Sequence, residues 1–420
     1  MAGRVAPTTQ GRAWRRLALQ LAGWAALLLV LRLTVVPAES RDLLTPEELR
    51  ASSTAAREWI ERNLQPDGRY TYAYDADLDA LPDDYNEVRH AGVTMALFQS
   101  AGRDGDIDAF RTGDIAVEWM LDRLYRRDGW AALTTPQGDR AKVGASGLML
   151  IALAERRLAT GDTRHDEVMR ELGSFLATMQ RPDGGFYLAW LIERGEPDFV
   201  GTSRYYPGEA TWGLALLHEA LPGEGWDEYA RAGSIFLTTR RDEVEDVRFR
   251  PLPDHWAAYS MAEMVEWGLS DEEIEYARRL AGRFGFLIRA ESQRENGLFG
   301  GPGSLIRVHV RAAAFGTWVE AMGALWRVAA ADPRMADLKP AIEERIEVGA
   351  SLLANRQSDA VEALAYPRPR FVEGAWVTRG ETRMDDQQHA LSGLLFAADA
   401  LEGRTLRSPA DPLTILDALP

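Results

Sequence analysis

Histidine is rare in this sequence, and its few copies are not spread evenly. Four of the six histidines stand near the start of segments that turn from polar to small and apolar residues: His90, His255, His309 and His389. The same starts carry acids, tyrosines and arginines. Imidazole, carboxylate and phenol groups can exchange protons with a substrate, so this grouping predicts acid–base chemistry where the segment starts meet in space.

Two sets of candidate residues follow from this grouping. The first set could move protons or attack a bond, and its members are Glu209, His255, His389, His90, Asp254 and Asp386. The second set could bind a substrate through charge, hydrogen bonds or ring stacking, and its members are Tyr85, Asn86, Arg89, Lys142, Arg204, Tyr205, Tyr206, Trp256, His309, Arg311 and Arg383. A structural interpretation stands beside the functional one, because an Asp at a helix start commonly serves as an N-cap.

Glycoside hydrolysis is the first chemistry that these residues would suit. It needs one carboxylic acid to protonate the leaving oxygen and one carboxylate to activate water. Glu209, together with one of Asp254, Asp386 or Glu87, would supply the two groups. Because these acids come from different segments, their separation is expected to suit an inverting enzyme.

Proton abstraction next to a carbonyl or carboxylate is the second chemistry. It needs a base, an acid on the other face and cations that offset the developing negative charge. His255 and His389 would form the pair, with Arg89, Arg311 and Arg383 as the cations. The third interpretation is non-catalytic, as a glycan-binding or envelope-assembly component. A fourth interpretation is a divalent metal ion held by the histidines and aspartates. Because the sequence has no local metal motif, phosphate loop or nucleophile elbow, we predict no cofactor and no metal.

The charge of the chain limits its partners. Its formal net charge is −16, and residues 1–38 contain five arginines and no acid, so the rest carries −21. This excess of negative charge argues against nucleic acid as a partner. There is no cysteine, which excludes disulfides, thiolate metal sites and cysteine nucleophiles.

The N-terminus has the pattern of an export signal. Three arginines at positions 12–16 precede the apolar run Leu17–Leu31, and Val36-Pro37-Ala38 fits a cleavage site after Ala38. The run is also long enough for an uncleaved membrane anchor. We therefore predict that residues 1–38 are a signal peptide or anchor, that the protein meets the membrane only there, and that the remainder lies outside the cytoplasm.

The rest of the chain is predicted to be all-α. Apolar residues recur with a period near 3.6 in twelve segments: roughly 46–64, 87–101, 107–126, 143–159, 163–180, 208–221, 225–241, 255–268, 271–290, 309–331, 335–356 and 386–402. The even-numbered segments open with Ala, Gly and Ser, whereas the odd-numbered ones are more charged. Small residues suit a crowded inner ring and charged amphipathic helices an outer ring. This alternation predicts an (α/α)6 toroid of six helical hairpins over residues 39–405, with short β-hairpins at one face and a tail at 406–420.

This helical pattern over residues 45–402 resembles the toroids of six-hairpin glycosidases, N-acylglucosamine 2-epimerases and related polysaccharide lyases. Pro253-Asp254-His255-Trp256 is similar to the Pro-Gly-His segment of the epimerases, and His389 opens the twelfth helix, where that family also places a catalytic histidine. The family's Asn-Pro-x-Met-His segment is not matched, since Tyr206-Pro207-Gly208-Glu209 stands there. The resemblance implies a carbohydrate-active enzyme and supports His255 and His389 as a catalytic pair.

Two shorter pieces resemble the QW motif of terpene cyclase toroids, where it braces the ends of outer helices. One consists of Phe175-Leu176, Gln180, Gly184 and Phe186, and the other of Trp59-Ile60, Gln65, Gly68 and Tyr70. The Asp-rich signature of those cyclases is missing, because Met384-Asp385-Asp386-Gln387 lacks its first Asp. We therefore expect these pieces to be structural.

These observations lead to one functional prediction and two alternatives. We predict an extracytoplasmic glycoside hydrolase that acts on an acidic, uronate-containing glycan, because arginines are abundant at the segment starts. The alternatives are a sugar epimerase or uronate lyase and a non-catalytic glycan-binding component.

Overall fold

The computed structural model describes residues 9–34, 38–295 and 309–404. It divides into two compact units, one formed by residues 1–41 and 289–309 and the other by residues 42–288 and 310–420. We call the second the helical unit. The predicted tail at 406–420 and the Val36-Pro37 part of the cleavage site lie outside the described residues.

The first unit contains the N-terminal apolar helix α1 (Thr9–Thr34). Its stretch Ala13–Arg32 is exposed and, by length and composition, is able to cross a membrane. This agrees with the predicted signal or anchor. Elsewhere in this unit, Glu39 forms an ion pair with Arg289 at 2.9 Å, and the backbone amide of Ser40 donates to the carbonyl of Ser292.

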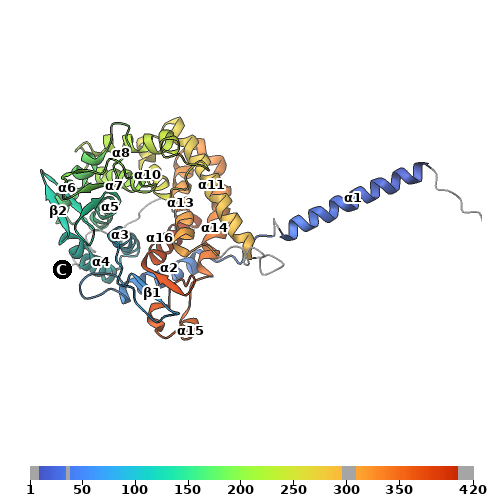
Figure 1. Ribbon diagram of the computed structural model, residues 1–420, viewed down its shortest axis with the longest axis horizontal. Helices are drawn as coiled ribbons and strands as arrows, with labels where there is room; N and C mark the ends of the chain where they lie inside the picture. Colours follow the sequence, from blue (N-terminus) through green and yellow to red (C-terminus); the bar gives the residue numbers. More distant parts are fainter. Residues whose placement is uncertain (1–8, 35–37, 296–308, 405–420) are drawn as a thin grey trace, which may run out of the picture. The chain divides into compact units, whose positions relative to one another are not determined.

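The helical unit is a double ring of six helical hairpins (Figure 1). The outer helices are α2 (Pro46–Arg62), α4 (Ile107–Leu121), α6 (Asp166–Met179), α8 (Trp226–Ile235), α11 (Asp271–Glu295, of which residues up to 288 belong here) and α14 (Lys339–Ala354). The inner helices are α3 (Glu87–Asp104), α5 (Val143–Thr160), α7 (Tyr206–Ala220), α10 (His255–Met264), α13 (Ala312–Ala331) and α16 (Met384–Leu401). The predicted (α/α)6 toroid is confirmed.

The two rings differ in burial as their compositions predict. The outer helix α6 buries one stripe, which includes Met169, Leu172, Phe175 and Leu176, and leaves Glu167 exposed on another side. The inner helix α5 is buried all round from Val143 to Arg156. An outer helix thus needs only one apolar face, whereas an inner helix has packing neighbours on every side.

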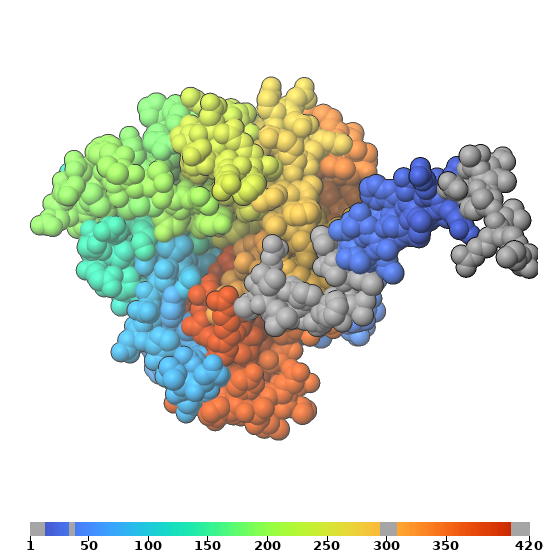
Figure 2. All heavy atoms as spheres, turned by 45° about the vertical axis from the view of Figure 1, so that its right-hand side comes forward, coloured from blue at the N-terminus to red at the C-terminus, as the bar shows by residue number. Residues whose placement is uncertain are grey.

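Each inner helix packs against the next, and α16 returns to α3 to close the inner ring. The ends of the unit also meet in a two-stranded sheet, in which β1 (Ala73–Asp75) pairs antiparallel with β7 (Glu381–Arg383). In Figure 2 the orange-red part of this unit accordingly lies beside its blue part. Strands some 300 residues apart in the sequence therefore close the toroid.

Glycines let the inner helices approach closely. A Cβ atom built on Gly316 of α13 would lie 2.5 Å from the backbone carbon of His389 on α16. A Cβ on Gly144 of α5 would overlap the carboxylate of Glu209 on α7. The small residues that open the inner segments are thus required by backbone contact, as the sequence predicts.

Short strands decorate the loops that lead into the inner helices. They form the hairpin β2 (Leu124–Arg127) and β3 (Trp130–Leu133) and the three-stranded sheet β4 (Arg140–Lys142), β5 (Ala189–Leu191) and β6 (Glu196–Pro197). The QW-like pieces are structural: the side-chain amide of Gln180 donates to the carbonyls of Gly184 and Tyr229, which joins the end of α6 to α8.

A few boundaries differ from the prediction. Residues 225–241 do not form one helix, because α8 passes into a π-helical turn at Phe236–Arg240 and then into α9 (Arg241–Val244). The helix predicted at 255–268 ends at Met264, where a 3-10 turn follows. Another 3-10 turn, Pro333–Leu338, precedes α14. The short helix α15 (Ala360–Ala363) was not predicted, because four residues are too few to show a helical period.

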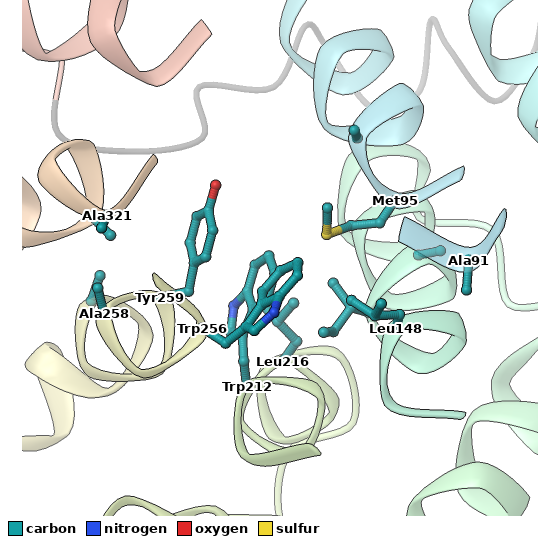
Figure 3. Close-up of a cluster of buried hydrophobic side chains, with 14 of the residues drawn as sticks. Ala91, Met95, Leu148, Trp212, Leu216, Trp256, Ala258, Tyr259 and Ala321 are labelled. Atoms are coloured by element: carbon teal, nitrogen blue, oxygen red, sulfur yellow. The ribbon is translucent and has the colours of Figure 1, made fainter. Parts of the chain in front are cut away.

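Aromatic rings fill part of the interior of the inner ring (Figure 3). Trp212 of α7 stacks on Tyr259 of α10 with ring centroids 4.3 Å apart, and its other neighbour, Trp256, is 5.7 Å away. Met95 and Leu148 face this cluster from α3 and α5 (Figure 3). The aromatic cluster therefore makes the inner ring a packed core rather than an open channel.

Candidate functional site

All six inner helices contribute to one cavity, which we call the mouth cavity. Its lining residues come from the first two turns of these helices and the loops before them: Val88, Arg89, Leu148, Tyr205, Glu209, Pro253, His255, Trp256, Ala313, Ala314, Thr317, Trp318, Asp385, Gln388 and His389. The helix starts predicted to converge do converge. Because each start presents unpaired N–H groups, the cavity favours ligands rich in oxygen.

Two lining residues of this cavity, His255 and His389, lie around one buried carboxylate, that of Glu320. Nδ1 of His389 lies 2.8 Å from Oε2 of Glu320, and the hydroxyl of Tyr259 donates to Oε1 of Glu320 at 3.2 Å. Nε2 of His255 lies 3.8 Å from Oε2 of Glu320, and the two imidazole centroids are 5.1 Å apart. Residues from α10, α13 and α16 thus hold two imidazoles next to each other around one buried carboxylate.

The two histidines differ in their surroundings. His255 is buried against Trp256, with ring centroids 4.0 Å apart, and its Nε2 has no hydrogen-bond partner in the structure. Burial, with His389 nearby, lowers the pKa of His255 well below its usual value. His389 keeps 13% of its side chain exposed and is held by Glu320. At neutral pH His255 is therefore an uncharged imidazole. The imidazole of His389 is held in place by Glu320 and reaches the solvent.

Glu209 is the buried acid of the mouth cavity. Its side chain is only 4% exposed, and its Oε2 has no hydrogen-bond partner in the structure. Burial, assisted by the negative charge of Asp254, raises its pKa to about 8. Glu209 is consequently protonated at neutral pH and can donate a proton or a hydrogen bond.

The other predicted acids lie behind the cavity lining and are bound to cations. Asp254 is fully buried, pairs with Arg241 and caps α10 through the amide of Trp256. Asp386 pairs with Arg311 at 2.7 Å and accepts from the amide of Ala313. These contacts are structural, and neither carboxylate lines the cavity, so we withdraw both as catalytic candidates.

Glu87, the remaining predicted partner of Glu209, is engaged in the same way. It is buried and pairs with Lys142 at 2.8 Å, and neither residue lines the mouth cavity. Of the acids proposed for hydrolysis, Glu209 alone lines this cavity.

His90 is a packing residue. It is fully buried, its Nε2 lies 2.9 Å from the carbonyl of Ala116, and its Nδ1 lies 2.7 Å from the hydroxyl of Tyr85. Its ring packs on Trp119, and burial lowers its pKa to about 3. His90 and Tyr85 do not line the cavity, because their polar atoms are used to join α3 to α4 and to the Tyr70 loop. Asn86 is the N-cap of α3.

The cations predicted to bind an acidic sugar already have acidic partners. Arg89 and Arg383 both pair with Asp385, at 3.2 and 3.1 Å. Arg311 pairs with Glu381 as well as Asp386. These pairs take away the basis for predicting an acidic substrate, since the positive charge at the cavity is largely neutralised within the chain.

The remaining predicted binding residues divide into three groups. Tyr205 and Trp256 line the mouth cavity, where their rings could stack on a sugar. Tyr206 and the exposed Arg204 stand beside it in sequence but are not part of its lining. His309 belongs to the first unit, where it pairs with Glu291 at 3.4 Å.

Sequence reasoning missed several residues of the site. Glu320 was overlooked because it lies in the third turn of α13, beyond the helix starts. Trp318, Asp385 and Gln388 line the mouth cavity without having been selected. A signal for Glu320 was present, since it is the only acid among the twenty residues of α13, and a lone buried acid needs a partner.

The His255, Glu320 and His389 donor atoms lie within 4.8 Å of one another, and their types are those that zinc accepts. Without an ion, Nδ1 of His389 already pairs with Oε2 of Glu320. The absence of a metal cofactor stays a prediction.

Comparison with solved structures places this arrangement in a known fold. A cellobiose 2-epimerase from Spirochaeta thermophila matches with a TM-score of 0.57 and 13% identity, covering 85% of this chain and 98% of its own. The chain has the six-hairpin toroid fold. A D-mannose isomerase matches this toroid with a TM-score of 0.56 and 10% identity over 83% of this chain and 96% of its own. An unsaturated glucuronyl hydrolase specific for heparin matches with a TM-score of 0.56 and 12% identity, covering 87% of this chain and 100% of its own.

At these identities the likeness establishes the fold of the toroid and not its reaction. No protein-family model matches the sequence, and neither does any curated protein sequence. The chemistry must therefore be argued from the residues of the mouth cavity.

Proposed function

We propose that this chain is a carbohydrate-active enzyme that transfers a proton at the carbon beside the carbonyl of a neutral sugar, as an epimerase or isomerase does. The observation that carries the proposal is the pair of imidazoles on the cavity wall, His255 and His389, around the buried carboxylate of Glu320. The cellobiose 2-epimerase and the D-mannose isomerase, which share the fold, support this class of substrate.

Glu320 determines which nitrogen of His389 is basic. When Glu320 is ionised, Nδ1 of His389 carries the proton and donates a hydrogen bond to Oε2. Nε2 then has a free lone pair that can accept a proton. Tyr259 stabilises the same carboxylate through its hydroxyl group. His389 is thereby held as a general base whose positive charge, once it accepts a proton, is offset by Glu320.

The reaction then needs two proton transfers at carbon. One imidazole takes the proton from the carbon beside the sugar carbonyl, so the C–H bond breaks and an enediolate forms. The imidazolium formed in this step passes its proton to the second imidazole, whose ring centroid is 5.1 Å away, and the second imidazole returns a proton to carbon, so both imidazoles end uncharged and there is no net oxidation. Arg89 and the amide of Gln388 line the same cavity and could hold the enediolate oxygens. A neutral sugar is favoured because the arginines of the site are paired with acids.

Hydrolysis, which the sequence placed first, has one specific observation in its favour. Glu209 is a buried carboxyl group with a pKa of about 8 that lines the cavity, as a leaving-group acid should. The second carboxylate would have to be Asp385, which is bound by Arg89 and Arg383. We therefore keep hydrolysis as the second candidate, and binding without turnover as the third.

Solvent exchange separates these candidates. Cellobiose and D-mannose are incubated with the protein in D₂O, and deuterium at the carbon beside the carbonyl is followed by NMR. We expect incorporation with the wild type, loss with His255→Ala and His389→Ala, and no change with His218→Ala, which lies beside Asp227 and outside the cavity. Release of reducing ends that Glu209→Gln abolishes would favour hydrolysis instead.

The place of action is also part of the proposal. The exposed apolar helix α1 supports export or anchoring at a membrane. We infer that the helical unit works outside the cytoplasm.

A further inference from the structure

A second cavity opens where the inner helices end. We call it the rear cavity, and its apolar walls include Phe98 of α3, Leu158 of α5, Trp326 of α13 and Phe396 of α16. It shares no lining residue with the mouth cavity. The proposed reaction does not use it, so its shape and chemistry need another explanation.

An aromatic partition separates the two cavities. Trp212 and Tyr259 line the rear cavity, and Trp256, which is stacked beside Trp212, lines the mouth cavity. Figure 3 shows the three rings as one cluster. A molecule in the rear cavity would therefore contact the far side of the cluster that supports His255.

The walls of the rear cavity suit a small organic molecule. Pockets for such ligands combine apolar walls with a few polar groups. The rear cavity has aromatic and aliphatic walls together with several charged residues, which are Arg103, Glu155, Arg327, Asp399 and Arg404. Among these lining charges, arginines outnumber carboxylates.

The arginines of the rear cavity differ in how closely each is paired with a carboxylate. Arg103 forms a close ion pair with Asp399, and Arg404 pairs with Glu402 at 3.0 Å. Arg327 has its carboxylate partner, Glu263, at 3.9 Å, which exceeds hydrogen-bond distance. Its side chain is 15% exposed. The guanidinium of Arg327 thus has donors left for an anionic group, which it can bind with two parallel hydrogen bonds.

We propose that the rear cavity is a second small-molecule site, which binds an organic carboxylate with an aromatic or branched apolar body. The apolar body lies between Phe98, Leu158 and Phe396, and the carboxylate pairs with Arg327. This inference does not depend on the reaction at the mouth cavity, since the two sites share no lining residue.

Fluorine NMR on the full chain in detergent tests this site with 4-(trifluoromethyl)benzoate as the probe. We expect saturable binding by the wild type. Ala159→Trp fills the cavity with an indole ring and should weaken binding by about tenfold or more. Ala341→Trp makes the same change at an exposed position of α14 and should bind like the wild type in the same detergent.

A second variant keeps the test decisive if Ala159→Trp does not fold. Arg327→Gln should weaken benzoate binding several-fold but leave binding of the neutral 4-(trifluoromethyl)benzamide unchanged. Glu209→Gln, in the mouth cavity, should leave both probes bound as in the wild type. Equal binding by folded Ala159→Trp and Ala341→Trp, or equal weakening of both probes by Arg327→Gln, would overturn the proposal.

Discussion

Oε2 of Glu320 lies 2.8 Å from Nδ1 of His389, although the two residues are 69 positions apart in the sequence. Glu320 is fully buried, and burial raises the pKa of its carboxyl group, while the bonds from His389 and Tyr259 act in the opposite direction. A buried carboxylate is costly without such partners. This pairing is the link between the packing of α13 against α16 and the proposed base.

Glu320→Gln tests that link. The amide keeps the size of the side chain but cannot offset the charge that forms on His389, so we expect kcat to fall by about 10²-fold with a small change in KM. Steady-state kinetics over a range of pH would measure kcat and KM. If Glu320 positions His389, the substitution also shifts the acidic limb of the plot of kcat against pH. Glu343→Gln, the same change beside Trp326 and Lys339, should leave the kinetics as they are.

Glu209 should make stability depend on pH in a definite direction. Its pKa is about 8 in the folded chain and near 4.5 when unfolded, so between these values the folded state holds more protons. Stability contributed by this group is therefore present below pH 4.5 and is lost as the pH rises toward 8. Each pH unit in that window changes the free energy of unfolding by at most about 1.4 kcal/mol.

Glu209→Gln removes this dependence. Urea unfolding at pH 5 and pH 8 should show the variant gaining stability relative to the wild type by up to a few kcal/mol at the higher pH. A constant difference between the two proteins across this range would contradict the assignment of a protonated Glu209.

His90→Ala separates packing from catalysis. The substitution leaves a cavity beside Trp119 and removes the partners of Tyr85 and of the Ala116 carbonyl, so we expect a loss of about 2–4 kcal/mol in the free energy of unfolding. Turnover per folded molecule should stay within a few-fold of the wild type. A complete loss of turnover in a folded variant would show that His90 takes part in the reaction.

Much of this toroid could be predicted because its information is local. The helical period and the small residues that open each inner segment depend only on neighbours along the chain, and both are confirmed, as at Gly144 and Gly316. The ion pair of Arg89 with Asp385 and the pairing of β1 with β7 join distant segments, and no local pattern specifies either. This is why the sequence assigned catalytic roles to more acids of the mouth than the cavity contains, and why Glu320 was missed.

Gly316→Ala tests the inner ring itself. The added methyl group would lie against the backbone of His389, so we expect a loss of about 1–3 kcal/mol in unfolding free energy. Gly282→Ala is the matched control on the outer helix α11, where a Cβ meets nothing within 4 Å, and it should stabilise the protein by about 0.5–1 kcal/mol. An equal loss of unfolding free energy in Gly316→Ala and Gly282→Ala would contradict close packing at Gly316.

The central claim is that His255 and His389 act together on the carbon beside a sugar carbonyl. The most direct measurement is deuterium incorporation from solvent at that carbon. It compares the wild type, His255→Ala, His389→Ala and His218→Ala under the same conditions. We predict incorporation by the wild type and His218→Ala and at least about a 10²-fold lower rate in the other two. Unchanged incorporation in folded His255→Ala and His389→Ala would contradict the account.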